Sequence, residues 1–522
     1  MKASLNFRVN LRSIMILLIF AAVMFAVCIM PASAATTITV DDSGGANYTT
    51  IQAAINASSA GDTIYVYNGS YSENVNVNKQ LTLQGEGADV VTVTNSTANN
   101  HVFDVNVDYV NISGFNVTGA TGSLKAGIYL NSKQHCNISN NNASGNYYGI
   151  YLYSASNNTL TNNNASNNNQ YGIYLWSSNN NTLTSNNALS NNQHGIYLWS
   201  SNNNTLTSNN ALSNSQYGIY LWASSNNMLT SNNVSNNTNY GIDLRSSNNN
   251  MLTSNNANLN NGYGIYLWAS SADNTLTSNN ASNNINCGIY LLSSSNNTLT
   301  NNNALNNSQH GIYLWSSSNN TLTNNNASNN SQQGIYLRSS SNNNALTNNT
   351  GNSNNYGIHL WLSSNNNALT NNTANSNIQH GIQLVTSCNN NTLASNTANF
   401  NSNRGIYLWS LCSNNTLTNN TASSNTQYGI YLQTSSNNTI YNNYFNNTNN
   451  AYDIGYNIWN TTRTTGTNII GGSWLGGNYW YDYAGADTNG DGLGDTLLSY
   501  NSSGNIDIGG DYHPLVVDIT AP

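Results

Sequence analysis

The chain has 522 residues, of which only 5% are charged, and its formal net charge is −8 at pH 7. Its 10 Lys and Arg residues form no basic patch, so a nucleic-acid partner is not expected. The high Asn content alone would be typical of a disordered polar tract. However, Ile, Leu and Ala recur at fixed spacing, which a disordered chain has no reason to preserve and a stacked core requires.

The first 34 residues are typical of an export signal. Three basic residues precede an apolar run over residues 14–30, and Ala32-Ser33-Ala34 offers a small-residue cleavage site. The alternative is an uncleaved membrane anchor, because the run is close to spanning length. We expect a signal peptide over 1–34, a secreted or cell-surface mature chain, and no membrane span after the signal is removed.

Residues 36–120 form an N-terminal cap and irregular early coils. Residues 50–57 place apolar side chains at helical spacing and predict a short helix. A strand is predicted at 63–67, and alternating residues predict further short strands up to residue 117. The helix is the candidate cap, because the open end of a solenoid exposes its core and an unpaired strand edge.

One sequence unit repeats throughout residues 121–450. It starts with Gly-Ile-Tyr-Leu-Trp, as at 172–176, and continues about eleven residues later with Asn-Asn-x-Leu-Thr. The first Gly returns every 22 to 24 residues, at 127, 149, 172, 195, 218, 241, 264, 288, 311, 334, 357, 381, 405 and 429. A period this regular is the signature of a solenoid.

Each repeat reads as two or three short strands joined by Asn/Ser turns. Alternation places Ile173 and Leu175 on one face of a strand and Tyr174 and Trp176 on the other. The frame of a leucine-rich repeat is absent. We predict an all-β fold, a right-handed parallel β-helix with 22–24-residue coils. Equivalent residues then stack roughly 4.8 Å apart, where like charges would repel and Asn side chains can bond along the column.

Several segments carry a family resemblance. They are residues 50–55, 61–66 and 81–87, the two repeated words, and Gly476-Gly477-Asn478-Tyr479-Trp480. The chain resembles NosD-like β-helix proteins, and most of all the Asn-rich surface proteins of methanogenic archaea. The resemblance implies a pectin-lyase-like solenoid, kinship with carbohydrate-binding and sugar-hydrolysing β-helices, and a link to copper delivery. Copper requires converging His, Met or Cys ligands, but His194, His310 and His380 lie in distant coils, so copper is not expected.

Catalysis on such a fold needs clustered carboxylates, and a glycosidase needs two of them about 5–10 Å apart. Between residues 120 and 450 the only acidic residues are Asp243 and Asp273, which fall on different sides of their coils. Asp243 shares the outward face with Arg245, where we expect a weak surface ion pair. We therefore predict a non-enzyme, with a polysaccharide-modifying hydrolase or lyase as the disfavoured alternative.

An outward column of Trp and Tyr is the candidate carbohydrate-binding surface. Extensive exposed aromatic surface commonly marks a binding face, although aromatic cross-strand pairs also simply stabilise sheets. The candidate residues are Tyr174, Trp176, Tyr197, Trp199, Tyr220, Trp222, Tyr266, Trp268, Trp315, Trp361 and Trp409. We expect a monomer that binds or lies within extracellular polysaccharide or another glycan. The alternative is a purely structural envelope or adhesion spacer.

The C-terminal segment, residues 451–522, contains an Asp-rich loop. Its candidate calcium ligands are Asp487, Asn489, Asp491, the Leu493 carbonyl and Asp495, at positions 1, 3, 5, 7 and 9 of an EF-hand-like loop. Position 12 is Leu rather than Glu, so a full EF-hand is excluded. We predict a structural calcium ion that orders this segment, with an Asp/Gly-rich turn as the alternative.

Two further features concern covalent modification. Cys388 and Cys412 each lie five residues before the Leu of their coil, so they should stack within disulfide range in adjacent coils. A disulfide is predicted, with two free thiols as the alternative. Asn-x-Ser/Thr sequons, including those at Asn47, Asn68 and Asn95, offer glycan acceptors in an exported protein.

Overall fold

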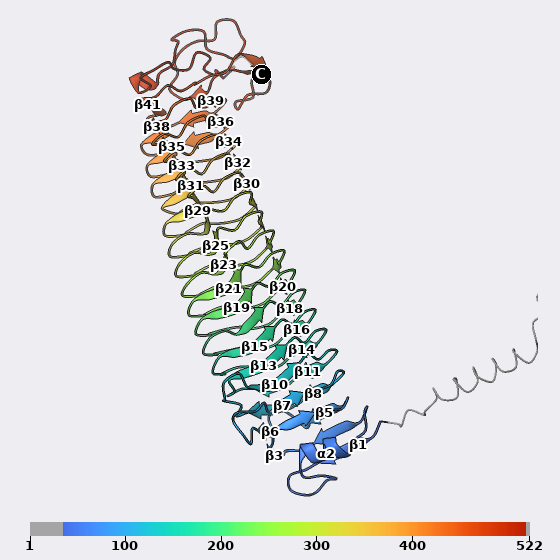
Figure 1. The fold of residues 1–522 in the computed structure, drawn as a ribbon. Coiled ribbons are helices and arrows are strands. Elements are labelled where there is room, and N and C mark those ends of the chain that lie inside the picture. The colour runs from blue at the N-terminus through green and yellow to red at the C-terminus, as the bar shows by residue number, and fades with distance from the viewer. Residues whose placement is uncertain (1–34, 518–522) are drawn as a thin grey trace, which may run out of the picture.

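A computed structural model describes residues 35–517, which form a long rod of stacked coils. Figure 1 shows the short strands of successive coils following one another from the N-terminal end to the C-terminal end. The predicted all-β, right-handed parallel β-helix is confirmed. Residues 1–34, which carry the predicted signal, lie outside the described part of the chain. No helix within residues 35–517 is long and apolar enough to cross a membrane.

One side of the rod is an 18-stranded parallel sheet with one strand per coil, called here the threonine sheet. Its strands are β1 (Thr37–Val40), β2 (Thr63–Val66), β5 (Thr82–Gly85), β8 (Asn111–Ser113), β11 (Asn137–Ser139), β14 (Thr159–Thr161), β16 (Thr182–Thr184), β18 (Thr205–Thr207), β20 (Met228–Thr230), β22 (Met251–Thr253), β24 (Thr275–Thr277), β26 (Thr298–Thr300), β28 (Thr321–Thr323), β30 (Ala345–Thr347), β32 (Ala368–Thr370), β34 (Thr392–Ala394), β36 (Thr416–Thr418) and β39 (Thr439–Tyr441).

A second side is another parallel sheet, called here the aromatic sheet. Its strands are β4 (Val75–Val77), β7 (Phe103–Val105), β10 (Ala126–Asn131), β13 (Tyr148–Tyr153), β15 (Tyr171–Trp176), β17 (Ile196–Trp199), β19 (Tyr217–Trp222), β21 (Tyr240–Arg245), β23 (Ile265–Trp268), β25 (Ile289–Leu292), β27 (Ile312–Trp315), β29 (Gln333–Arg338), β31 (Tyr356–Trp361), β33 (His380–Val385), β35 (Arg404–Trp409), β38 (Tyr428–Gln433) and β41 (Ala451–Asp453).

The third side is the least regular. It starts as a four-stranded sheet, continues through the middle of the rod as single-residue bridges from Asn142 to Thr421, and ends as a three-stranded sheet. Its strands are β3 (Gly69–Ser72), β6 (Val91–Thr94), β9 (Asn116–Thr118), β12 (Asn142–Ala143), β37 (Thr421–Ser423), β40 (Tyr444–Asn446) and β44 (Tyr479–Trp480). β42 (Thr464–Thr465) and β43 (Trp474–Leu475) form an antiparallel pair, and η1 (Ser502–Gly504) is a short 3-10 helix.

The core is one continuous apolar column inside the coils. The inward residues Ile173, Leu175, Leu183 and Ala188 are fully buried, as their alternation predicted, and their counterparts repeat along the rod. Glycine recurs at the first position of the repeat for a steric reason. A Cβ on Gly172 would lie 2.5 Å from the Ala165 carbonyl oxygen, so no larger residue fits.

The corners of the coils explain the abundance of Asn and Ser. In the coil that starts at residue 171, Ser177, Asn180, Ser185 and Ser190 have φ between 51° and 57°. This left-handed region is enriched in Asn, whose short side chain can bond locally. Each coil therefore needs several residues that tolerate positive φ.

Buried Asn ladders run along the rod, as the stacking of equivalent residues predicted. Asn209 is fully buried, its Oδ1 accepts from the Asn186 Nδ2 (3.0 Å), and its Nδ2 donates to the Asn232 Oδ1 (3.0 Å). The same Nδ2 also donates to the Leu183 carbonyl (2.9 Å). Each ladder Asn therefore supplies hydrogen bonds to buried backbone and side-chain groups of the adjacent coils. These hydrogen bonds offset the free-energy cost of burying the polar groups.

The N-terminal end is covered by α2 (Ile51–Ala57), which confirms the predicted helix. Thr50 is its N-cap, and the Glu73 carboxylate accepts from the Ile51 (2.8 Å) and Gln52 (2.9 Å) backbone N–H groups. A carboxylate at a helix N-terminus satisfies free N–H groups and complements the helix dipole. β1, which was not predicted, pairs with β2 beside this helix.

The chain after β41 folds irregularly over the last coils (Figure 1). Trp459 and Trp480 continue the core there and are each 1% exposed. The indole nitrogen of Trp480 donates to Asp511 (2.8 Å), and burial raises the pKa of that carboxyl to about 6. These buried hydrogen bonds fix the segment that closes the C-terminal end of the core.

Candidate functional site

The predicted aromatic column exists on the outward face of the aromatic sheet, and its rings stack along the rod axis. The ring centroids of Trp176 and Trp199 are 4.9 Å apart and those of Trp199 and Trp222 are 5.1 Å apart, with interplanar angles of 5° in both pairs. In-register pairing of β15, β17 and β19 sets this geometry. Because each ring covers its neighbour, the stacked Trp residues present their edges outward.

A parallel tyrosine column lies beside the Trp column and is largely buried. Tyr174 and Tyr197 stack at 5.0 Å, and Tyr197 and Tyr220 at 4.9 Å. These three side chains are only 4–7% exposed, and Tyr266 is 8% exposed. Burial raises the pKa of the Tyr220 phenol to about 12. The expectation that these Tyr side chains form part of an exposed aromatic surface is therefore wrong, because face-to-face stacking covers them.

Two arginines fill gaps in the Trp column. The Arg245 guanidinium carbon lies 4.6 Å from the Trp222 centroid and 4.4 Å from the Trp268 centroid. Arg338 occupies the same position between Trp315 and Trp361, at 4.6 Å and 4.5 Å. Such cation–π contacts contribute about 0.5–2 kcal/mol each. They also cover the ring faces that an interrupted stack would otherwise expose.

Trp409 differs from the other members of the column. Its register neighbours are Val385 and Gln433, so neither an aromatic ring nor an Arg guanidinium covers it, and it is 44% exposed. It is therefore the candidate whose ring is most accessible to a ligand.

The expected surface ion pair between Asp243 and Arg245 is not formed. Asp243 is fully buried between Tyr220 and Tyr266 in the tyrosine column, and its Oδ1 accepts from the Trp268 Nε1 (2.8 Å). Desolvation raises the pKa of this carboxyl to about 8. Arg245 instead stacks between two indoles, which satisfies its charge without a carboxylate.

A polar pocket at the N-terminal end of the aromatic sheet was missed by the sequence analysis. It has a volume of about 520 Å³ and is lined by Asn74, Val75, Asn76, Asn100, His101, Asp104, Lys125 and Tyr129. Asp104 and Tyr129 are register partners of Asn76 and Tyr151, so the pocket continues the tyrosine column. The signal in the sequence was the charge at positions 104 and 125, just before the nearly uncharged repeats.

The titratable groups of this pocket are perturbed. The His101 ring stacks on Tyr129 at 4.0 Å, its Nδ1 accepts from the Ala126 N–H (3.0 Å), and burial lowers its pKa to about 4. Burial raises the pKa of Asp104, whose Oδ1 is buried without a hydrogen-bond partner. A neutral imidazole, a carboxyl group, an ammonium group and a phenol therefore line one cavity.

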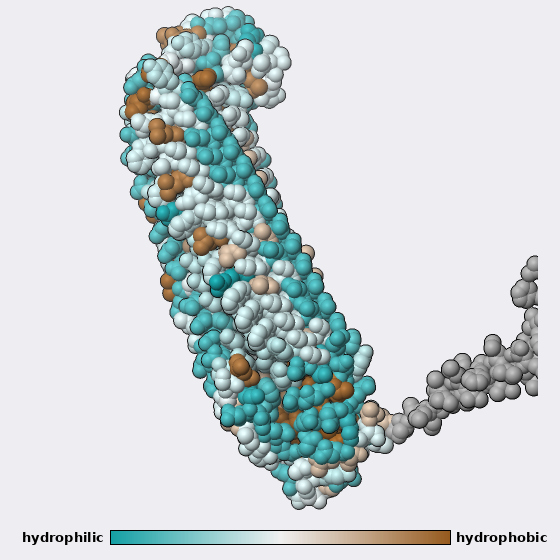
Figure 2. Space-filling view, viewed as in Figure 1, coloured by the Kyte–Doolittle hydropathy of each residue, from teal (hydrophilic) through white to brown (hydrophobic). Residues whose placement is uncertain are grey.

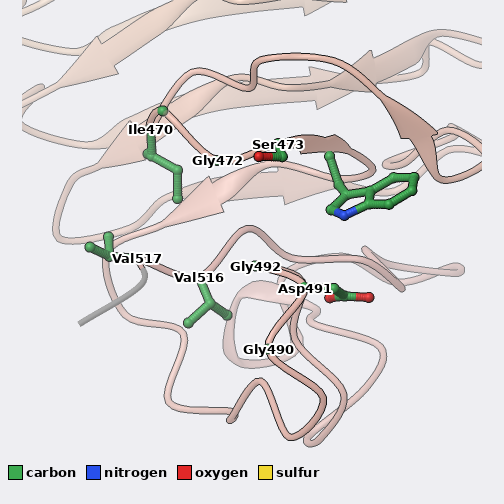
Figure 3. A pocket seen from close by; sticks show the side chains of 10 residues that line it. Ile470, Gly472, Ser473, Gly490, Asp491, Gly492, Val516 and Val517 are labelled. Carbon is green, nitrogen blue, oxygen red and sulfur yellow. The ribbon is translucent and has the colours of Figure 1, made fainter. Parts of the chain in front are cut away.

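The Asp-rich loop adjoins a second cavity, shown in Figure 3. This cavity of about 330 Å³ is lined by Ile470, Gly471, Gly472, Ser473, Trp474, Gly490, Asp491, Gly492, Val516 and Val517. Asp487 accepts from the backbone N–H groups of Gly490 (2.8 Å) and Gly492 (2.7 Å). Asp491 forms an ion pair with Arg463 at 2.7 Å.

The predicted calcium ligands do not converge on a cation in this conformation. Asp495 accepts from the Thr488 N–H and hydroxyl (both 2.7 Å), and Asp491 accepts from the Leu493 N–H (2.9 Å) as well as pairing with Arg463. Within residues 35–517 no group of three His, Cys, Asp or Glu side chains is placed to hold a metal. The loop is held by its own hydrogen bonds, and calcium binding stays a prediction.

Cys388 and Cys412 occupy equivalent positions in adjacent coils, as predicted, but both are free, buried thiols. Each Sγ donates to the backbone carbonyl three residues earlier, Val385 and Trp409 respectively, at 3.2 Å. Ser341 makes the same contact with the Arg338 carbonyl. The predicted disulfide is therefore not formed in this structure, and each thiol takes the place of a serine in a hydrogen-bonded column.

The histidines of the repeats belong to the aromatic packing. His194 stacks between Tyr171 and Tyr217 at 5.0 Å and 4.8 Å, and burial lowers its pKa to about 3. His310 packs edge-on against Tyr313. His194 takes the place of a ring in a further column, which Tyr171 and Tyr217 form.

Comparisons with known proteins agree with this architecture. The family described as right handed beta helix region matches residues 36–189, 126–281 and 258–374, and the periplasmic copper-binding protein (NosD) family matches residues 360–485. A cell surface glycoprotein of Methanothermus fervidus is 32% identical over 108 residues, which cover 20% of this chain and only 17% of that protein.

Two solved structures match much of the chain at low sequence identity. The A-module of the Azotobacter vinelandii mannuronan C-5 epimerase AlgE6 is 16% identical, with a TM-score of 0.41 over 71% of this chain and 93% of that one. The Dettilon tailspike protein is 15% identical, with a TM-score of 0.32 over 73% of this chain and 64% of that one. The right-handed β-helix matches overlap and together span residues 36–374, and the NosD match confirms the resemblance read from the repeats. The chain therefore belongs to the right-handed β-helix family.

Proposed function

We propose that this chain is a non-catalytic, extracellular cell-surface rod that associates with polysaccharide along its aromatic sheet. The observation that carries the proposal is the outward row of indole edges and Arg side chains along the aromatic sheet, which only Leu292 and Val385 interrupt between Trp176 and Trp409. The cell surface glycoprotein of Methanothermus fervidus supports the location, although this chain matches only a part of it.

The mode of binding differs from the one that the sequence indicates. Because the ring faces of Trp176, Trp199 and Trp222 are mutually covered, sugars would meet the edges of the indole rings. Trp409 is the exception, since its neighbours are Val385 and Gln433 and nearly half of it is exposed. A sugar ring could stack on this one indole.

Binding is tested with the mature chain, residues 35–522, and a panel of soluble and insoluble polysaccharides. Saturable binding that falls in Trp409→Ala and in the triple variant Trp176→Ala/Trp199→Ala/Trp222→Ala, with unchanged circular dichroism, supports the proposal. Met228→Ala is the matched control, because Met228 is 44% exposed on the threonine sheet. If the wild-type chain binds no polysaccharide, the aromatic column only stabilises the sheet and the chain is a spacer.

A polysaccharide-modifying enzyme is the second candidate, and the pocket at His101 and Asp104 favours it. General acid–base work requires groups with shifted pKa values in a shared cavity, and these two residues meet that requirement. New reducing ends or unsaturated sugars, abolished by His101→Ala and Asp104→Asn, would establish catalysis and overturn the non-catalytic proposal.

A further inference from the structure

The outward face of the threonine sheet carries two parallel rows of threonine. Each strand from β14 onward reads Thr-Leu-Thr or a close variant, and the central Leu is buried, so the flanking residues point to solvent. The first row contains Thr159, Thr182, Thr205, Thr275, Thr298, Thr321, Thr392, Thr416 and Thr439. The second row contains Thr161, Thr184, Thr207, Thr230, Thr253, Thr277, Thr300, Thr323, Thr347, Thr370 and Thr418.

Strand pairing keeps these rows in register. Thr182 pairs with Thr205 and Thr184 with Thr207, and the same alignment continues from coil to coil. The second row is unbroken from Thr161 to Thr370. Neighbouring coils lie about 4.8 Å apart and two residues along a strand span about 6.6 Å, so the hydroxyls form a two-dimensional array wherever both rows carry Thr. The first row is interrupted by Met228, Met251, Ala345 and Ala368.

The hydroxyl groups of this array are free to bind an external partner. Within the described residues, none of them makes a hydrogen bond to another protein group, even though cross-strand Thr pairs often do so. The ladder residues Asn181 and Asn186, which flank β16, are buried and hydrogen-bonded, so the backbone beneath is fixed. A rigid array loses little entropy when it binds.

The chemistry of the face limits the kind of partner. Between residues 120 and 450 the charged residues are Lys125, Lys133, Asp243, Arg245, Asp273, Arg338 and Arg404, and none lies on a strand of this sheet. Neither of the cavities described above is lined by these threonines. Figure 2 shows hydrophobic surface on the visible side only as separate patches along the rod. A flat, uncharged, periodic surface complements an uncharged periodic partner.

We propose that the threonine sheet binds ice. The two repeats of the array are close to oxygen–oxygen repeats on the prism faces of hexagonal ice. The threonine hydroxyls take lattice positions of water, and the methyl groups sit in the hollows between them. A single sugar or peptide would use only a few coils, whereas a crystal lattice engages the whole unbroken row. This surface is separate from the aromatic sheet, so the inference does not depend on polysaccharide binding.

The test uses the mature chain produced without N-linked glycans, because the sequons at Asn180 and Asn203 lie beside the first row. Thermal hysteresis, inhibition of ice recrystallisation and partition into a growing ice hemisphere are measured. The wild-type chain is expected to be active in all three. Thr207→Lys/Thr253→Lys should lose the activity, and Thr253→Val, which keeps the methyl group, should lose part of it.

Ser215→Lys is the matched control, since Ser215 is exposed at another corner of the rod and its side chain makes no described hydrogen bond. It should retain full activity with the same melting temperature as the threonine variants. Exclusion of the wild-type chain from ice, or equal activity in wild type and Thr207→Lys/Thr253→Lys, would overturn the proposal. Binding of the threonine face to crystalline polysaccharide but not to ice would overturn it as well.

Discussion

The Asp243 carboxylate accepts a 2.8 Å hydrogen bond from the Trp268 indole nitrogen while it lies fully buried among aromatic rings. Its second oxygen has no partner within the described chain. In neighbouring coils this position is held by Tyr220 and Tyr266. Desolvation raises the pKa of Asp243 to about 8, which places a titratable group inside the stacked column.

This relationship predicts that stability falls as the pH rises. The folded chain keeps the Asp243 proton up to about pH 8, whereas the unfolded chain releases it near its ordinary pKa of 3.8. Between these values the unfolded state binds fewer protons, so the free energy of unfolding decreases as pH increases. Asp243→Asn keeps an oxygen for Trp268 and removes the ionisation. At pH 8 we expect it to be more stable than wild type by an amount on the order of 5 kcal/mol.

The measurement is the melting temperature of both proteins from pH 4 to pH 9. The buried histidines, Asp104 and Asp511 titrate in both proteins, so the difference between the two curves isolates Asp243. The curves should converge near pH 4 and separate up to pH 8. Parallel curves would show that Asp243 is ionised in the fold.

The sequence predicts the backbone path of each coil, but not how the outward side chains of adjacent coils pack against one another. Regular spacing of Gly172, Ile173 and Leu183 is enough to derive the solenoid, because each has one geometric role that repeats. The environment of Asp243 was misjudged because alternation places a residue outward without saying that stacked rings will cover it. For the same reason, the sequence pattern did not predict the burial of Tyr174 or the mutual covering of the Trp ring faces.

The pocket at His101 could not be derived for a different reason. It is built in irregular early coils, where Asp104 and Lys125 come from separate turns and no period relates them. The parallel pairing of β7 with β10 brings these two coils together at the pocket. In a repetitive segment the period shows which residues of adjacent coils are in contact. The early coils have no period, so their contacts could not be predicted in this way.

The Asn ladder predicts a large local effect of a single substitution. Asn209→Ala removes the acceptor of the Asn186 backbone and side-chain N–H groups and the donor to the Leu183 carbonyl. Leaving such groups buried and unpaired costs about 2–4 kcal/mol. Hydrogen exchange of the amides in these coils should accelerate accordingly. Asn192→Ala in the same part of the rod is the control, because Asn192 is exposed, and a similar acceleration there would contradict the ladder's role.

The cysteine column predicts that reducing agents leave the stability of the rod unchanged. Cys388 and Cys412 are buried thiols that donate to backbone carbonyls, and burial raises the pKa of Cys388. A maleimide should therefore label neither residue in the native chain and both after unfolding. Cys388→Ser/Cys412→Ser should melt within a few degrees of wild type, because serine fills this column in other coils. A clear fall in melting temperature on reduction would instead reveal a disulfide.

The C-terminal loop predicts competition between calcium and an arginine. Asp491 is a predicted calcium ligand, yet its carboxylate pairs with Arg463, whose side chain is 42% exposed. Exposed ion pairs contribute only about 0–1 kcal/mol, so Arg463→Gln should leave the fold intact. By freeing Asp491, it should tighten calcium binding up to about fivefold, which corresponds to about 1 kcal/mol. Calorimetric titration with calcium chloride measures this, and Asp487→Asn should weaken binding in both backgrounds. If neither wild type nor Arg463→Gln takes up calcium, the loop is a turn stabilised by its own hydrogen bonds, with Asp487 bound to the N–H groups of Gly490 and Gly492.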